Sequence, residues 1–146
     1  MSEALLYGPL GAAIVATVAA QAIKLLLAAA TERRFAPERL LETGGMPSSH
    51  SASVAALATA LGITEGVTSP VFAVAMVLAG IVMYDATGIR RAAGMQAQLI
   101  NDLVEELGHL FDEGFQPDAL QTLLGHTYPQ VLVGALLGVA TAVLLV

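Results

Sequence analysis

The feature that most constrains this chain is an almost uninterrupted apolar stretch over residues 8–30, broken only by Gln21 and Lys24. As an α-helix rising about 1.5 Å per residue it is about 34 Å long, enough to cross the hydrocarbon core of a bilayer. Glu3 precedes the stretch and two arginines follow it, which reverses the charge order of a cleavable signal peptide. We therefore interpret residues 8–30 as a retained transmembrane helix.

The composition agrees with a membrane protein. Hydrophobic residues make up 56% of the 146 residues and charged residues 12%, with a mean hydropathy of +0.75. Soluble domains contain about 45–50% hydrophobic and about 25% charged residues. We expect a single membrane domain over residues 1–146. The 12 acidic and 6 basic residues include no basic run, so nucleic acid is not expected as a partner. The absence of cysteine removes thiolate chemistry.

Three further apolar segments and one amphipathic segment follow. Residues 51–63 are short, and Pro70 opens the next segment at 71–83, so these two are interpreted as a helical hairpin. The last apolar segment covers residues 130–146. Over residues 88–111 apolar residues recur at helical spacing opposite charged ones. The expected fold is all-α, an integral membrane bundle of about four membrane helices plus one amphipathic interfacial helix.

Alternating membrane crossings place the loop at 31–49 and the region at 84–126 on one face of the bilayer. All five arginines fall on this face, and Lys24 lies close to it. The positive-inside rule makes it the cytoplasmic face, and we expect the plasma (inner) membrane. Both histidines outside the amphipathic segment, His50 and His126, lie on the same face.

The residues gathered there are those that a phosphoryl group needs. A helix start near Pro47 offers free N–H groups to an anion, and the hydroxyls of Ser48 and Ser49 add donors. One imidazole can attack phosphorus while another protonates the leaving oxygen. His109, on the polar face of the amphipathic helix, is interpreted as merely solvated. A phosphate at a membrane surface implies a lipid substrate. The basic residues expected to bind it are Lys24, Arg34, Arg90 and Arg91.

Three motifs carry a family resemblance. They are GMPSSHS at 45–51, YDATGIRR at 84–91 followed by AGMQA at 93–97, and LGHT at 124–127. In this order they resemble the divergent branch of the type 2 phosphatidic-acid phosphatase superfamily, often labelled acid phosphatase/vanadium-dependent haloperoxidase-related proteins. The similarity runs from Gln21 to Gly138. It implies a lipid phosphatase that needs no metal.

The resemblance assigns roles to individual residues. His50, in Pro-Ser-Ser-His, matches the acid that protonates the leaving group, although Ser49 replaces the usual glycine. His126 matches the nucleophile that forms a phosphohistidine. Gln130 stands where the superfamily has an aspartate, and it is expected to orient His126 with less electrostatic support than a carboxylate. Leu120 stands where the superfamily has an arginine.

Several assignments stay open at this point. Arg90 or Arg91 is expected to replace the arginine missing at Leu120, and either Arg33 or Arg34 accompanies Lys24. Asp85 is expected either to orient His126 from across the bundle or to coordinate Mg²⁺ with a substrate diphosphate.

Two structural expectations concern the chain around and after His126. Asp118 is predicted to cap one short helical segment. Gln130, Gly134 and Gly138 form a stripe at intervals of four that predicts close helix contact, within the chain or between the copies of a homodimer.

Three functions are compatible with these residues. The first is hydrolysis or transfer of phosphate from a membrane lipid phosphate or diphosphate through His126, without a cofactor. The second keeps the pocket without the chemistry, as a phospholipid- or polyprenyl-phosphate-binding or structural membrane protein. The third is a Mg²⁺-dependent phosphotransferase centred on Asp85.

Overall fold

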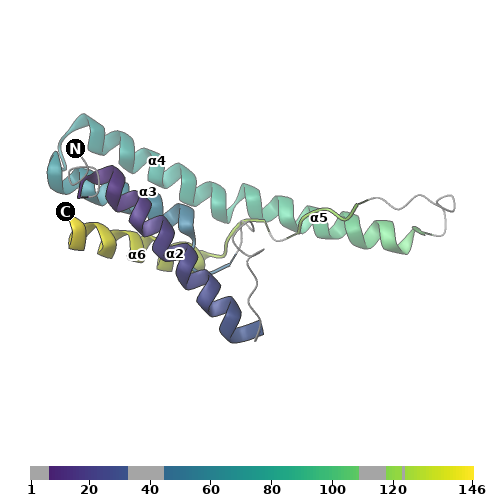
Figure 1. Cartoon of the computed structure of the whole chain (residues 1–146). Coiled ribbons are helices and arrows are strands. Elements are labelled where there is room, and N and C mark those ends of the chain that lie inside the picture. The colour runs from purple at the N-terminus through teal and green to yellow at the C-terminus, as the bar shows by residue number, and fades with distance from the viewer. Residues whose placement is uncertain (1–6, 33–44, 109–117, 123) are drawn as a thin grey trace.

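The computed structural model describes residues 7–32, 45–108, 118–122 and 124–146, and this part of the chain is all-α, without strands. The described helices are α2 (Pro9–Glu32), α3 (Ser49–Thr64), α4 (Pro70–Thr87), α5 (Ile89–Glu106) and α6 (Tyr128–Leu145). Figure 1 shows the start of α2, the turn between α3 and α4, and the end of α6 at one end of the bundle. The start of α3, the end of α4 and the start of α6 lie at the other end.

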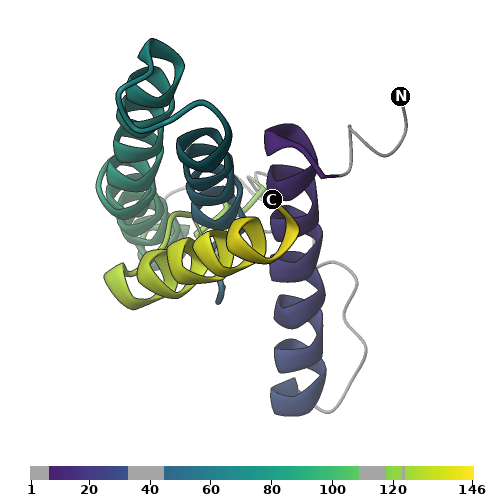
Figure 2. The ribbon, with the colours of Figure 1, turned by 90° about the vertical axis from the view of Figure 1, so that its left-hand side faces the viewer.

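The protein is an integral membrane helical bundle, as predicted. Among the described residues three helical stretches are long and apolar enough to cross a membrane. They are Pro9–Thr31 in α2, Pro70–Glu106, which covers α4 and α5 together, and Tyr128–Leu145, which is α6. The remaining helix of the bundle, α3, has 16 residues. It packs against α2, α4 and α6 and lies between them in Figure 2. The short apolar segment of the sequence is therefore the central helix.

Small side chains form the core of the bundle, and large apolar ones face outward. Leu26, Val74 and Leu144 are 70%, 68% and 84% exposed. In lipid, large apolar side chains gain little by turning inward, whereas small ones let helix backbones approach closely. The fully buried core residues are Ala12, Ala16 and Ala20 of α2, Ala52, Ala56 and Ala60 of α3, and Ala142 of α6.

The closest helix contact joins α6 to α3. A Cβ atom added at Gly134 would overlap the carbonyl oxygen of Ser48, and one added at Gly138 would overlap the carbonyl oxygen of Ala52. The glycines of the predicted small-residue stripe therefore bring two backbones together within one chain. This contact places the first turn of α3 beside the first turns of α6.

The starts of α3 and α4 follow from local sequence. Ser48 and Ser69 are the N-cap residues, and each side-chain oxygen accepts a backbone N–H bond, from Ser51 and Phe72 respectively, both at 3.3 Å. Pro70 occupies the first turn of α4, where its missing N–H costs nothing.

The predicted amphipathic helix is α5. It continues from α4 beyond an interruption at Gly88 and leads away from the other helices (Figure 1). The apolar side chains of Leu99 and Leu103 are 66% and 52% exposed.

The short helix that Asp118 was expected to cap does not form, because residues 118–122 contain no helical turn. The side chain of Asn101 instead takes both backbone hydrogen-bonding groups of Leu120.

The α3–α6 contact predicts an effect of adding one methyl group. Gly138→Ala should destabilise the bundle by about 1–3 kcal/mol, because its Cβ meets backbone atoms that cannot move aside independently. Gly80→Ala is the matched control, since a Cβ at Gly80 meets nothing within 4 Å. Thermal unfolding of both variants in detergent measures the difference. Equal stability of the two variants would contradict this packing.

Candidate functional site

A pocket of about 210 Å³ lies where α3 begins and α4 ends. It combines side chains from α3, α4 and α5 with one from the loop before α6. Four of the predicted site residues line this pocket together, although they come from segments far apart in the sequence. They are His50, Asp85, Arg90 and His126. The lining residues are His50, Ile81, Val82, Asp85, Ala86, Arg90 and His126.

His50 is held by the start of α3. Ser48 is the N-cap residue, and its N–H donates to the carbonyl oxygen of Gln130 at 3.2 Å. This bond connects the start of α3 directly to the start of α6, beside the contact at Gly134. His50, in the first turn of α3, is therefore fixed relative to the segment that carries His126.

The serines before His50 serve the helix start. Ser48 is fully buried, and its Oγ accepts from the Ser51 hydroxyl at 3.0 Å as well as from the Ser51 N–H. Ser49 is also buried. Neither residue lines the pocket. The oxygen of the Ser48 hydroxyl accepts both bonds in capping α3, and its predicted role as a donor to phosphate stays a prediction.

Two backbone features place His126. Its N–H donates to the carbonyl oxygen of Ala86 at 2.8 Å, near the end of α4. Gly125 has a φ of 78°, and a Cβ there would lie 2.5 Å from the backbone nitrogen of Arg91. Only glycine allows the chain to pass so close to the α4–α5 junction. The residue that follows, His126, is 3% exposed.

Gln130 determines which nitrogen of His126 carries the proton. Its Oε1 accepts the backbone N–H of Thr127 at 3.0 Å, and the same oxygen lies 3.3 Å from Nδ1 of His126. Because an amide oxygen cannot donate, Nδ1 must carry the hydrogen of this second bond. Nε2 then has its lone pair free in the neutral ring. It is buried and has no hydrogen-bond partner among the described residues.

The surroundings of His126 favour this neutral ring. Burial lowers the pKa of His126 below its usual 6.5, and the charges of Lys24 and His50 lower it further. The hydrogen bond with Gln130 and the nearby backbone of Gly45 oppose this shift. At neutral pH the imidazole is therefore unprotonated at Nε2. A nucleophilic nitrogen requires this state.

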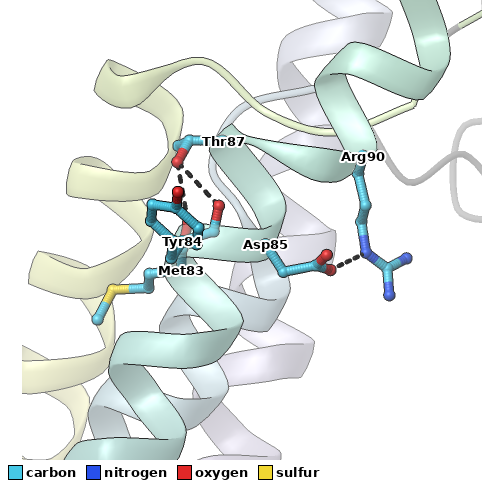
Figure 3. Close-up of polar contacts among 5 residues, drawn as sticks. All are labelled: Met83, Tyr84, Asp85, Thr87 and Arg90. Atoms are coloured by element: carbon cyan, nitrogen blue, oxygen red, sulfur yellow. Dashed lines mark hydrogen bonds and ion pairs between the residues drawn. The ribbon is translucent and has the colours of Figure 1, made fainter.

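Asp85 does not orient His126 in this structure. Figure 3 shows its carboxylate directed at the guanidinium of Arg90, and the two form an ion pair with Nε at 2.5 Å from Oδ2. The orienting position beside Nδ1 belongs to Gln130. No cluster of three or more histidine or acidic side chains suited to a metal occurs among the described residues. The Mg²⁺ alternative, in which Asp85 binds the ion together with a substrate diphosphate, stays a prediction.

The remaining basic residues predicted to bind phosphate are Lys24, Arg91 and Arg34. Lys24 is 6% exposed on α2, and its charge acts on both His50 and His126, although it does not line the pocket. Arg91 is exposed and outside the pocket lining. Arg34, like Arg33 and His109, lies outside the described residues. Leu120 lines a separate pocket beside α5.

The sequence analysis did not predict two of the interactions that position the site. Gln130 is the N3 residue of a capping box whose N-cap is Thr127, and the spacing Thr-x-x-Gln before an apolar run is the known signal for one. Asn101 binds Leu120 across the chain, and no local pattern indicates that pairing.

Comparison with known proteins identifies the class and then the family. The chain is 39% identical, over 94% of its length and 92% of the relative, to the uncharacterized membrane protein YuiD of Bacillus subtilis (strain 168). The fold and this relative define an integral membrane protein. The family model described as "Divergent PAP2 family" matches residues 7–141, and the chain belongs to this family, which is related to membrane phosphatases. No solved structure matches the chain.

The shared oxygen of Gln130 leads to a prediction about the titration of His126. Gln130→Leu should lower the pKa of His126 further, because the hydrogen bond that raises it is lost. Gln130→Glu should raise the pKa, because a carboxylate stabilises the imidazolium. NMR titration of labelled histidine measures both shifts, with Gln98→Glu on α5 as the matched control. Titration of His126 at the same pH in all variants would refute the interaction.

Proposed function

We propose that the protein removes phosphate from membrane lipid phosphates or diphosphates through a phosphohistidine at His126. The observation that carries this proposal is the buried Nε2 of His126, which has no hydrogen-bond partner among the described residues and lies in a pocket that also contains His50 and Arg90. Its lone pair is available because Gln130 holds the hydrogen on Nδ1. Family membership supports the same chemistry.

The reaction balances with the two histidines alone. Nε2 of His126 forms a bond to phosphorus while the bond from phosphorus to the leaving oxygen breaks, and that oxygen takes a proton from His50. Water then attacks the phosphohistidine and gives a proton to His50. The N–P bond breaks, and its electron pair returns to Nε2. Phosphate and the dephosphorylated lipid are the products.

Substrate charge helps His50 to act as the acid. Burial and the positive charges of Arg90 and Lys24 oppose its protonation, and Asp85 favours it. A phosphate dianion in the pocket adds negative charge close to the imidazole. Binding of the substrate thus favours the protonated His50 that the leaving oxygen requires.

The cationic side chains of the pocket suit the phosphate headgroup of a lipid, and its apolar side chains suit the hydrocarbon chain. Arg90 supplies a guanidinium for the phosphate oxygens, with Lys24 contributing charge from α2. Ile81 and Val82 line the side formed by the membrane helix α4. We propose that the site lies at the cytoplasmic face of the plasma membrane, as the arginine distribution indicates.

The direct test is phosphate release from lipid monophosphates and diphosphates by the purified protein in detergent with EDTA. The wild type should release phosphate and vanadate should inhibit it, whereas His126→Ala should release none. His109→Ala is the matched histidine control and should retain activity. Phosphate release by His126→Ala equal to that of the wild type would refute the phosphohistidine.

The role of His50 has a separate test. His50→Ala should lower kcat by about 10²–10⁴-fold on an alkyl phosphate, whose leaving oxygen needs a proton. The loss should be much smaller on p-nitrophenyl phosphate, whose leaving group is stable as an anion. An equal loss on both substrates would contradict the acid role.

A second candidate function is lipid phosphate binding without turnover. The observation that favours it is the neutral amide of Gln130, which stabilises a developing imidazolium less than a carboxylate does. Saturable binding of lipid phosphate by folded protein that releases no phosphate would establish this alternative.

A further inference from the structure

The chain reaches His126 along the side of α5. Residues 118–122 and 124–126, which we call the strap, run beside α5 towards the end of α4 (Figure 1). Each successive contact lies nearer to the start of α5, so the strap is antiparallel to the helix. The contacts are Leu120 with Asn101, Thr122 and Leu124 with Gly94, Gly125 with Arg91, and His126 with Ala86.

Asn101 is the outermost of these contacts and pairs with both backbone groups of one residue. Its Nδ2 donates to the carbonyl oxygen of Leu120 at 3.0 Å, and its Oδ1 accepts the Leu120 N–H at 2.9 Å. A segment without secondary structure must satisfy its backbone groups elsewhere. The Asn101 side-chain amide satisfies both the N–H and the carbonyl of Leu120, as the backbone of a paired β-strand would.

Gly94 lets the strap lie directly on the helix. A Cβ atom at this position would stand 2.6 Å from the carbonyl oxygen of Thr122 and 3.1 Å from that of Leu124. Any side chain here would lift the strap away from α5. Asn101 and Gly94 therefore define the path of the strap before it reaches Gly125.

We infer that Asn101 is a positioning residue for His126, acting through the strap. By binding Leu120 it holds the strap on α5, and the strap delivers the His126 backbone to the carbonyl of Ala86. Release of Leu120 removes the outermost of the contacts that hold the strap on α5 among the described residues. His126, now 3% exposed, then becomes accessible. The effect on accessibility is independent of the proposed function, and the effect on catalysis rests on it.

Chemical labelling tests the inference without relying on turnover. Diethyl pyrocarbonate modifies neutral imidazoles, and peptide mass spectrometry separates His126 from the other two histidines. In the full chain in detergent, Asn101→Ala should increase the labelling rate of His126 several-fold relative to His50. Gln98→Ala, a truncation at an exposed position of the same helix, should not. Wild-type labelling of His126 in folded Asn101→Ala would overturn the inference.

Asn101→Asp gives a graded test and serves if Asn101→Ala does not fold. Its carboxylate still accepts the Leu120 N–H but cannot donate to the Leu120 carbonyl, so labelling should lie between wild type and Asn101→Ala. Labelling equal to wild type in this variant would also overturn the inference.

Kinetics separate this inference from the proposed function. Asn101→Ala should lower kcat about tenfold with KM nearly unchanged, because a displaced nucleophile affects the chemical step. Raised labelling with an unchanged kcat would overturn the positioning role. If His126→Ala still released phosphate, the proposed function would fail, while the labelling rates would still decide the role of Asn101.

Discussion

The backbone contact between α3 and α6 is the constraint on which the site depends. Gly134 and Gly138 allow α6 to touch the backbone of α3, and the Ser48 N–H bonds to the carbonyl of Gln130 at the same place. His50 follows this contact on α3, and His126 precedes it on the α6 side. In lipid, apolar burial does not drive helices together, so close packing of this kind stabilises the contact. It fixes the segment that carries His50 relative to the segment that carries His126.

Gln130 joins the architecture of the helix to the chemistry of the pocket. One amide oxygen caps α6 at Thr127 and faces Nδ1 of His126. A helix cap is rigid, so the imidazole acquires a defined tautomer without a buried carboxylate. The result is an oriented ring that stays neutral, because burial lowers its pKa and an amide supplies no negative charge to reverse the shift. The carboxylate of the site belongs to Asp85, which pairs with Arg90.

Local patterns predicted most of the fold. The apolar stretches and Pro70 indicated the helices, and the glycine stripe indicated a close contact. Convergence of His50, Asp85, Arg90 and His126 followed from motifs and bilayer sidedness. One predicted side-chain partner differs: Asp85 pairs with Arg90, five residues further along the chain, rather than with His126.

The sequence by itself determined that the chain is a membrane bundle, and it predicted that His50 and His126 lie on one face of the bilayer, since apolar length and charge placement act locally along the chain. Only the tertiary structure decided that α3 is central and that Asn101 pairs with Leu120. These outcomes depend on distances of a few ångströms between segments far apart in sequence. Packing sets such distances, and no local spacing encodes them.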